Sequence, residues 1–473
     1  MKLYQQFAHE VAQMIAGGQL KPGERLPSVR EARARRGISA ATVFQAYQLL
    51  ERDGLVLARP QSGFYVNAQL ADPARTMPSS STHEGAAEVE VSDLVFQVLA
   101  QVRARGIAPL GSAFPGPDLF PLARLARAAN RGLGAMDPAA IVEHLSPGHP
   151  RLLEQIGLRY RIDGIRLAAN EIVVTHGALE ALNAALQVTT RPGDTVIVES
   201  PTFYAALQAI ERLGLKALPV PTSPESGIDL DALETALSRQ PVAACWLMPN
   251  FHNPTGAVMP DAAKRALVQM LAKRDIPLIE DDVYAELYYG SQRPRPAKAF
   301  DDSGRVLHCS SFSKSLAPGY RIGWVAGGRY AEAIQRLTLM TTLSASLPAQ
   351  TALMHYLEEG GYERHLRRLR GMLHGRMTTA LGEIAARFPS GTRLSRPRGG
   401  YFAWVELPDR VDAMRLHHAA LANGIGIAPG HLFSPDARFA RFIRINCGHD
   451  ERTTLPAIRR LGELAHDLLG ASP

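Results

Sequence analysis

The first fifty residues of the chain place apolar side chains at the spacing of short helices. The first series is Leu3, Phe7, Val11, Met14 and Ile15. This spacing predicts an amphipathic helix that ends near the Gly17-Gly18 pair. The capping-box pair Ser28 and Glu31 predicts a second helix that stops at Gly37, and Ser39 is placed to cap a third.

Two short apolar runs follow, at 55–57 and 64–66, on either side of a turn that contains Gly63. This pattern is typical of a β-hairpin. Three helices followed by a β-ribbon indicate a winged helix-turn-helix, in which the third helix enters a DNA groove. From the pattern alone, a three-helix interaction domain is the alternative.

Beyond about residue 91, short apolar runs alternate with amphipathic helices. The runs are EIVVT, DTVIVES, VAACWLMP, IPLIEDD and RVLHCSS. Such alternation predicts an α/β fold with a mostly parallel sheet covered by helices. A final part mixes strands such as YFAWVEL and FIRINC with helices, which predicts a small α+β domain. We therefore expect four parts: a DNA-binding domain (1–67), a flexible Pro- and Ser-rich linker (68–91), a large domain (92–345) and a small domain (346–473).

Charge is concentrated at the N-terminus. Residues 1–67 contain nine Lys and Arg against five Asp and Glu, which is a net +4 of the +7 carried by all 473 residues. This asymmetry is expected of a nucleic-acid module joined to a near-neutral body. The three cysteines match no metal-ligand spacing, and no apolar run approaches the ~20 residues of a membrane span. These features predict a reduced, cytoplasmic compartment and no membrane partner.

The strongest chemical signal is a lysine, Lys314, in the string SSFSKSLAPGYRIG that follows an apolar strand. A lysine amine can form a Schiff base with an aldehyde, while the neighbouring hydroxyls and Arg321 can bind phosphate. Upstream, the strand EIVVT leads into His176-Gly177-Ala178 at the start of a helix, where backbone N–H groups can hold phosphate.

Two further stretches complete a candidate site. The strand IPLIE ends in Asp281-Asp282-Val283-Tyr284, which places a carboxylate and a phenol at the sheet edge where α/β folds bind ligands. A carboxylate there would keep a pyridine nitrogen protonated and make the ring an electron sink. The stretch 252–256 (HNPTG) supplies an amide donor from Asn253. Each stretch alone has an ordinary structural explanation, so the evidence is their occurrence together.

The N-terminal motifs closely resemble the GntR family of bacterial regulators over residues 3–66. The resemblance rests on G-x-L-x-P-G-x-R-L-P-S-x-R at 18–30, G-x-S-x-x-T-V-x-x-A-Y-x-x-L at 37–50 and R-P-x-S-G before the last strand. It implies that double-stranded operator DNA is contacted by Arg30, Ser39, Thr42 and Gly63. One position that is often Arg in the family is Ala40 here, so readout can depend more on DNA shape and spacing.

The downstream motifs H-G-A, E-x-P-x-F, H-N-P-T-G, E-D-D-x-Y, S-x-S-K and R-x-N, in this order, resemble the fold-type I aminotransferases, which use pyridoxal 5'-phosphate. The resemblance implies that Lys314 links to the cofactor and that Asp281 pairs with the pyridinium. Arg444 would bind a substrate carboxylate, with a structural salt bridge as the alternative. The other implied cofactor contacts are Tyr284 and Asn253 to the ring oxygen, Phe203 against the ring, and Gly177, Ala178, Ser311 and Arg321 to the phosphate.

A GntR-type module joined to such a domain is the layout of the MocR regulators. Two features depart from many relatives. His176 and Ala178 replace hydroxyl residues at the phosphate loop, and His144 stands where a tyrosine usually crosses the dimer interface. Cofactor binding or turnover can be weaker as a result. Because fold-type I sites are completed by both subunits, the resemblance implies a homodimer.

The main hypothesis is a transcriptional regulator that binds pyridoxal 5'-phosphate and senses the cofactor or an amino compound. An active aminotransferase, with DNA binding secondary, is the alternative. A dimeric scaffold with an inert site is a third hypothesis, which the intact lysine string disfavours.

Overall fold

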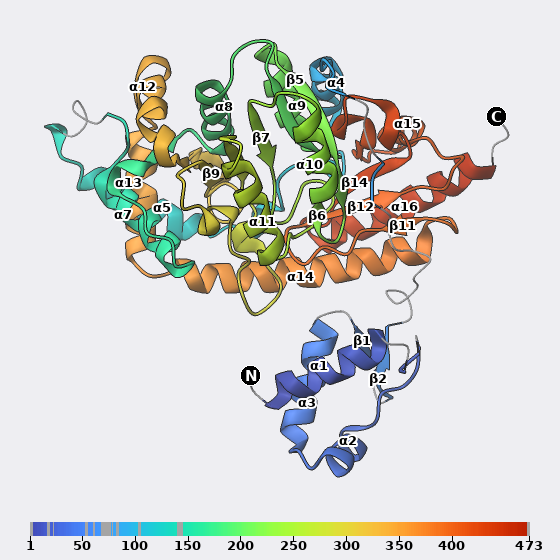
Figure 1. The fold of residues 1–473 in the computed structure, drawn as a ribbon. Coiled ribbons are helices and arrows are strands. Elements are labelled where there is room, and N and C mark those ends of the chain that lie inside the picture. Colours follow the sequence, from blue (N-terminus) through green and yellow to red (C-terminus); the bar gives the residue numbers. More distant parts are fainter. Residues whose placement is uncertain are drawn as a thin grey trace.

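A computed structural model of the chain describes residues 3–16, 19–21, 23–52, 55–59, 62–67, 77, 79–81, 85–102, 106–139 and 145–470. The fold comprises an N-terminal module and a two-domain body (Figure 1). Within the described ranges, no helix is long and apolar enough to cross a lipid bilayer.

The N-terminal module has the predicted order of elements: α1 (Leu3–Ala16), α2 (Val29–Arg36), α3 (Ala40–Arg52), β1 (Val56–Arg59) and β2 (Gly63–Val66). Ser28 and Glu31 form the expected capping box on α2, and Gly37 ends that helix with φ of 65°. The inner face of α3 is buried against α1 and the hairpin by Val43, Ala46, Tyr47 and Leu50. The winged helix-turn-helix is therefore confirmed.

The large domain is built on an eight-stranded sheet of order β3-β10-β9-β8-β7-β4-β5-β6. The strands are β3 (Ile172–Thr175), β4 (Thr195–Ser200), β5 (Lys216–Ser223), β6 (Gly227–Ile228), β7 (Ala244–Leu247), β8 (Leu278–Asp281), β9 (Val306–Ser311) and β10 (Gly323–Ala326). The neighbouring strands β5, β4, β7, β8 and β9 are parallel, as predicted. By contrast, β10 pairs antiparallel with β3 and β9, and β6 pairs antiparallel with β5. The parallel strands thus end at one edge of the sheet.

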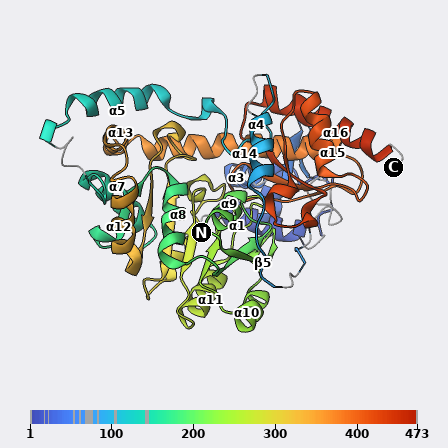
Figure 2. The same ribbon diagram turned by 90° about the horizontal axis from the view of Figure 1, so that it is seen from above.

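Helices cover both faces of this sheet. Alternate residues of a strand point to opposite faces and are therefore buried against different helices. On β4, Val196 and Val198 share a core with α8 and α9, while Ile197 belongs to the core beneath α10 and α11. Figure 2 shows α8 and α9 over the sheet and α5 beside α13 at its end. The helices of the large domain are α4 (Ser92–Val102), α5 (Leu122–Gly134), α7 (Pro150–Ile162), α8 (Ala178–Thr189), α9 (Tyr204–Arg212), α10 (Leu230–Arg239), α11 (Asp261–Ala272), α12 (Ala331–Thr341) and α13 (Leu347–Glu358).

The small domain contains an antiparallel sheet of order β11-β12-β14-β13, packed on helices. Its elements are β11 (Arg393–Leu394), β12 (Phe402–Glu406), β13 (Ala428–Pro429), β14 (Phe442–Asn446), α15 (Ala413–Ala422) and α16 (Glu451–Gly470). The 26-residue helix α14 (Tyr362–Arg387) runs along both domains (Figure 1). Its residues up to Leu373 join the large-domain core, and those from Met377 join the small-domain core. The domains therefore meet within α14, later than the predicted boundary at residue 346.

Part of the predicted linker is fixed to the large domain. Ala87 pairs with Ala217 of β5, and Val89 and Val91 are buried in the large-domain core. The Glu211 carboxylate accepts hydrogen bonds from the backbone N–H of Val91 and of the next residue at 2.9 and 3.0 Å. Residues 85–91 are thus not the flexible segment that we expected, because the apolar residues interspersed among the polar ones pack against the large domain. Residues 68–76 lie outside the described residues.

Candidate functional site

A cavity of about 470 Å³ lies at the edge of the large sheet where the parallel strands end. This is the edge at which open α/β sheets bind ligands, because loops and helix N-termini converge there. Seven of the nine residues predicted to contact a cofactor line the cavity, and Gly177 and Asn253 lie directly behind the lining. The seven are Ala178, Phe203, Asp281, Tyr284, Ser311, Lys314 and Arg321.

Asp281, the last residue of β8, presents a carboxylate to the cavity and is buried. Its Oδ1 atom has no hydrogen-bond partner within the described part of the chain. Burial, and then the neighbouring Asp282, raise the pKa of this carboxyl to about 7. A buried, unpaired carboxylate oxygen is costly without a cationic or donor partner. Asp281 therefore fits the role of partner to a protonated ring nitrogen.

Lys314 follows β9 and reaches the same cavity from the neighbouring strand. Its Nζ donates a hydrogen bond to the carbonyl of Ala113 (2.8 Å) and lies 3.7 Å from the ring centroid of Phe114. Burial, and then the charge of Arg444, lower the pKa of Lys314 to about 7. An amine with such a pKa is largely unprotonated slightly above neutral pH, which is the form that attacks a carbonyl.

A group of N–H donors lies at the end of the cavity where α8 begins. Gly177 precedes this helix with φ of 85°, a conformation that favours glycine, and a Cβ there would press on the Arg321 guanidinium. Arg321 donates to Ser313 Oγ at 3.1 Å and to the His176 carbonyl at 3.3 Å. A helix N-terminus beside a guanidinium and serine hydroxyls is suited to a phosphate group. Ser311 lies next to this group and accepts from the Ser313 N–H.

Aromatic side chains form the remaining wall. Phe203 lines the cavity beside Tyr204, whose ring centroid is 4.6 Å away. Asn253 Nδ2 donates to Tyr284 Oη at 3.5 Å, and burial raises the pKa of Tyr284 well above its usual range. Our sequence reasoning did not single out Tyr204 and Ser313 as lining residues. Their proximity to Phe203 and Lys314 in the chain was the available signal.

Arg444 lies on β14, is fully buried and does not line the cavity. Its hydrogen-bond partners are neutral oxygens: Asn253 Oδ1 at 3.0 Å and the carbonyls of Gly111 at 2.8 Å and Ser112 at 3.4 Å. Its Nε has no partner among the described residues. Within the same residues no carboxylate lies at ion-pair distance, so the salt-bridge alternative has no support. The segment 111–114 therefore engages both Arg444 and Lys314 through backbone carbonyls.

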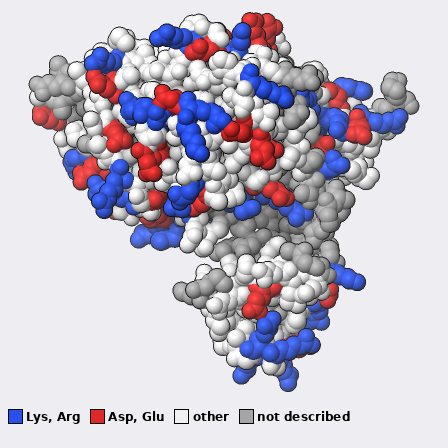
Figure 3. All heavy atoms as spheres, viewed as in Figure 1, with Lys and Arg blue, Asp and Glu red and all other residues white. Residues whose placement is uncertain are grey.

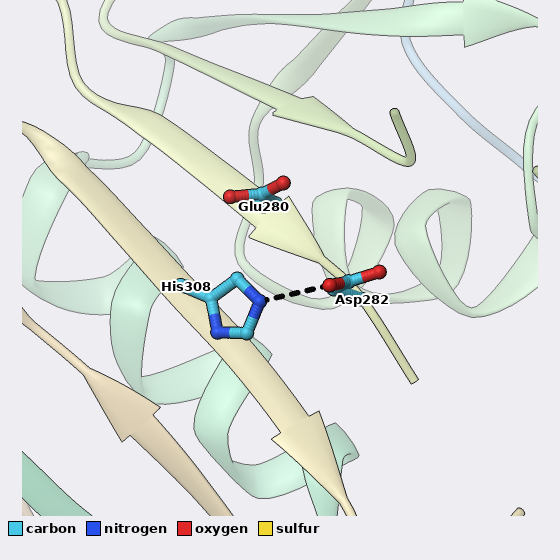
Figure 4. Close-up of side chains that lie close together, drawn as sticks. All are labelled: Glu280, Asp282 and His308. Atoms are coloured by element: carbon cyan, nitrogen blue, oxygen red, sulfur yellow. Dashed lines mark hydrogen bonds and ion pairs between the residues drawn. The ribbon is translucent and has the colours of Figure 1, made fainter. Parts of the chain in front are cut away.

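Glu280, Asp282 and His308 form a buried cluster (Figure 4). Because successive residues of a strand point to opposite faces, this cluster lies on the other face from Asp281. Carboxylates and imidazole are common metal ligands, but here protein groups already engage them. Glu280 accepts from the backbone N–H of residues 297 and 298, and a 3.0 Å hydrogen bond joins His308 Nε2 to Asp282 Oδ2. Burial lowers the pKa of His308, but the hydrogen bond to Asp282 and the negative charges of Glu280 and Asp282 together raise that pKa above its usual value. These hydrogen bonds thus connect β8, the strand that carries Asp281, to its neighbours.

Of the two departures noted in the sequence, one lies in the described residues. His176 Nδ1 lies 3.1 Å from Glu180 on the first turn of α8, and His176 is absent from the cavity lining. Its carbonyl, rather than its ring, contacts Arg321. His144 lies outside the described residues.

The predicted DNA-contact residues lie on the N-terminal module. Arg30 is exposed in the first turn of α2, and Gly63 opens β2 with φ of 103°. Ser39 Oγ accepts from the Thr42 N–H at 3.1 Å and also lies 2.8 Å from the Thr42 hydroxyl, so both hydroxyls stabilise the start of α3. Lys and Arg gather at the α2 end of this module in Figure 3, where α2 ends in Arg33, Arg35 and Arg36.

Comparison with known families and proteins agrees with this division. Residues 113–461 match the aminotransferase class I and II family, and residues 3–66 match the gntR family of bacterial regulatory proteins. YdcR of Escherichia coli K12, described as an uncharacterized HTH-type transcriptional regulator, is 47% identical over 471 residues, covering 99% of this chain and 100% of that protein. The 2-aminoadipate transaminase of Thermus thermophilus is 31% identical over 402 residues, covering 83% of this chain and 98% of that protein.

Solved structures resemble the body of the chain. The multiple substrate aminotransferase of Thermococcus profundus superposes with a TM-score of 0.75 at 27% identity, covering 80% of this chain and 96% of that one. The α-aminoadipate aminotransferase LysN of Thermus thermophilus, complexed with N-(5'-phosphopyridoxyl)-L-leucine, gives a TM-score of 0.72 at 28% identity, covering 80% and 99%. The predicted combination of folds is therefore confirmed.

Proposed function

Because the chain belongs to the MocR-type regulators, in which a GntR winged helix-turn-helix is joined to an aminotransferase class I and II domain, we propose that it binds pyridoxal 5'-phosphate. We further propose that its affinity for operator DNA changes when an amino compound binds beside that cofactor. The observation that carries the proposal is the convergence of Lys314 and Asp281 on one cavity. The phosphate-binding donors, the aromatic wall and the buried Arg444 described above also support the proposal.

The cavity offers a partner for each part of the cofactor. The unpaired Asp281 oxygen suits a ring nitrogen, and the donors at the start of α8, together with Arg321 and Ser311, suit the phosphate. Phe203 supplies a flat apolar surface, and Tyr284 and Asn253 supply donors for the ring oxygen. When bound, pyridoxal 5'-phosphate supplies an electron sink. Lys314, with its lowered pKa, supplies the amine that attaches covalently.

Arg444 is the proposed anchor for the carboxylate of an amino acid-like effector. A buried guanidinium with neutral partners gains strongly from a carboxylate, because the pair is charge-assisted and bidentate. The carbonyls of segment 111–114 hold Arg444 and Lys314 in this structure. An effector that competes for these groups would displace the segment, whose residues 112–114 line the cavity and which follows α4 and the docked residues 85–91 in the chain.

An effector can regulate DNA binding only if it binds two conformations of the protein with different affinities. Competition for Arg444 and Lys314 can supply this difference. Leu99 of α4 lines the same cavity as segment 111–114, and α4 in turn contacts α9. The docked residues 85–91 are covalently continuous with α4 and lead back toward the DNA-binding module. We therefore propose this path as the route by which an effector changes DNA affinity.

A homodimer completes this proposal, with two winged modules that span paired half-sites. Exposed apolar side chains beside the cavity support it: Leu179, Met340 and Leu343 are 47%, 76% and 59% exposed. Thr342 and Glu180, which neighbour them in the chain, are joined by a 2.9 Å hydrogen bond, so the end of α12 lies against the start of α8. A partner subunit would cover these three side chains.

The deciding experiment is a gel-shift titration of DNA flanking the protein's own gene, with cofactor-free and cofactor-loaded protein and with added amino acids. Amino acid-dependent shifts in affinity, without net keto acid production, support the sensor. An unchanged affinity under all conditions contradicts it.

The second candidate function is catalytic transamination, which the lowered pKa of Lys314 and the aminotransferase relatives favour. It predicts many equivalents of keto acid per protein. Keto acid assays on the same samples separate the two functions.

A further inference from the structure

A second cavity, of about 220 Å³, opens where α5, α13 and α14 meet, and it shares no lining residue with the cavity of Lys314. Arg124 and Arg127 line it from α5, and Arg364 lines it from the first turn of α14. Glu359 also lines it, but its carboxylate forms an ion pair with Arg131. The cavity therefore carries an excess of positive charge.

The N-terminus of α14 opens into this cavity. Gly361 is the N-cap of the helix and provides no side chain to accept from its first N–H groups. A Cβ built on Gly361 would lie 3.5 Å from Arg124 Nη1 and 3.9 Å from Tyr356 Oη. A guanidinium, a phenol and the positive end of a 26-residue helix thus converge on one small volume.

Tyr356 is an independent indication of a ligand. Its side chain is only 2% exposed, yet its hydroxyl has no hydrogen-bond partner within the described residues. Burial raises the pKa of this hydroxyl, so it stays a donor across the physiological range. Buried hydroxyls are normally hydrogen-bonded, and an unsatisfied one indicates an acceptor that the protein itself does not supply.

The acids of the adjoining turns do not supply that acceptor. Glu358 pairs with Arg151, and Glu363 pairs with Arg159 at 2.9 Å. No ion pair of Arg124, Arg127 or Arg364 occurs among the described residues. The described lining of the site therefore holds three arginines against one carboxylate, that of Glu359, which is already paired with Arg131.

We propose that this cavity binds the phosphate group of a small phosphorylated ligand. Tyr356 Oη and the first N–H groups of α14 donate to it, and Arg124 pairs with its charge, with Arg127 and Arg364 nearer the entrance. A concave site with a buried donor favours a small ligand over the convex backbone of duplex DNA. The ligand would contact the helix that joins the two domain cores, and the proposal does not depend on the function proposed for Lys314.

The test is isothermal titration of inorganic phosphate at constant ionic strength into full-length protein saturated with pyridoxal 5'-phosphate, so that the first cavity is filled. Arg124→Gln should raise the phosphate Kd roughly tenfold or more, because a charge-assisted bond is lost. Tyr356→Phe, which removes only the hydroxyl, should raise it roughly threefold to tenfold. Arg336→Gln on α12, whose arginine is exposed and paired with Glu332, is the control and should leave it unchanged.

Three outcomes overturn the proposal. One is phosphate binding that is absent or equal in wild type, Arg124→Gln and Tyr356→Phe. Another is phosphate binding that only Arg321→Gln removes, which would place the ion in the first cavity. The third is a loss of operator affinity in Arg124→Gln with unchanged phosphate affinity, which would assign these arginines to a DNA backbone.

Discussion

Replacing Asp281 by Asn should stabilise the cofactor-free protein and destabilise the cofactor-loaded protein. The carboxylate is buried and one of its oxygens is unpaired. Without a cation beside it, its ionised form carries a desolvation cost that an amide does not. With a protonated ring nitrogen beside it, the same carboxylate gains a charge-assisted bond that an amide cannot form.

The size of the effect follows from the pKa of Asp281, which is raised from 3.8 to about 7. That difference corresponds to about 4 kcal/mol in the fully ionised state. Between these two pKa values the folded chain holds more protons than the unfolded chain, so stability falls as pH rises and levels off above pH 7. From pH 5 to pH 8 the loss assignable to this carboxyl is about 2.5 kcal/mol.

The assay is thermal unfolding of cofactor-free wild type and Asp281→Asn at pH 5 and pH 8. The variant should gain roughly 3–5 °C in Tm over wild type between these two pH values. Asp302→Asn is the control, because Asp302 is exposed and does not line the cavity. Saturating pyridoxal 5'-phosphate should raise the Tm of wild type more than that of Asp281→Asn.

Two results would refute this reasoning. A variant whose Tm advantage is the same at pH 5 and pH 8 would mean that the carboxyl does not titrate in a buried, unpaired state. Equal stabilisation of both proteins by the cofactor would mean that Asp281 does not face its ring nitrogen, and the proposed cofactor position would be wrong.

Two further predictions address the two halves of the molecule. Lys314→Ala should abolish borohydride-fixable cofactor attachment, measured by mass spectrometry; an adduct of unchanged yield in this variant would assign the attachment to another lysine. Because a phosphate contact is lost, Arg30→Ala should lower affinity for operator and unrelated DNA alike and reduce the slope of log affinity against log salt concentration by about one. Gel shifts at several salt concentrations measure this slope. An unchanged slope would mean that Arg30 does not contact DNA.

The local structure of this chain is largely predictable from its residues. The capping box of Ser28, the stop at Gly37 and the hairpin at Gly63 depend on near neighbours in the sequence, and the structure has all three. The strands ending at Asp281 and before Lys314 follow from short apolar runs bounded by polar residues. Because parallel strands end at one edge, the meeting of these two side chains could also be anticipated.

Features that depend on distant contacts were not predictable. Residues 85–91 have the composition of a linker, and their attachment depends on β5 and on Glu211, more than a hundred residues away. The domain boundary within α14 is set by which core each turn meets, and the helix itself is continuous. The backbone carbonyls that Arg444 contacts come from segment 111–114, and a contact through a backbone carbonyl leaves no signature in residue type.

That segment provides the most direct test of how a ligand could reach the DNA-binding module. A Cβ on Gly111 would lie 2.7 Å from the backbone of Ile427, so Gly111→Ala must push the segment away from the small domain. The Gly111 carbonyl would then release Arg444, as a bound carboxylate is proposed to do. Gly157→Ala on α7, where a Cβ meets nothing within 4 Å, is the matched control.

Gly111→Ala should therefore bind operator without effector about as tightly as wild type does with effector, and it should bind the effector more tightly, because the binding-competent state no longer has to be formed. Gel shifts and ligand titrations measure the two affinities, and near-UV circular dichroism confirms that the fold is retained. A correctly folded Gly111→Ala protein with wild-type affinities for both DNA and effector would show that displacement of this segment is not the signal. The coupling would then have to run through another part of the cavity wall, such as the start of α8, where Leu179 is exposed.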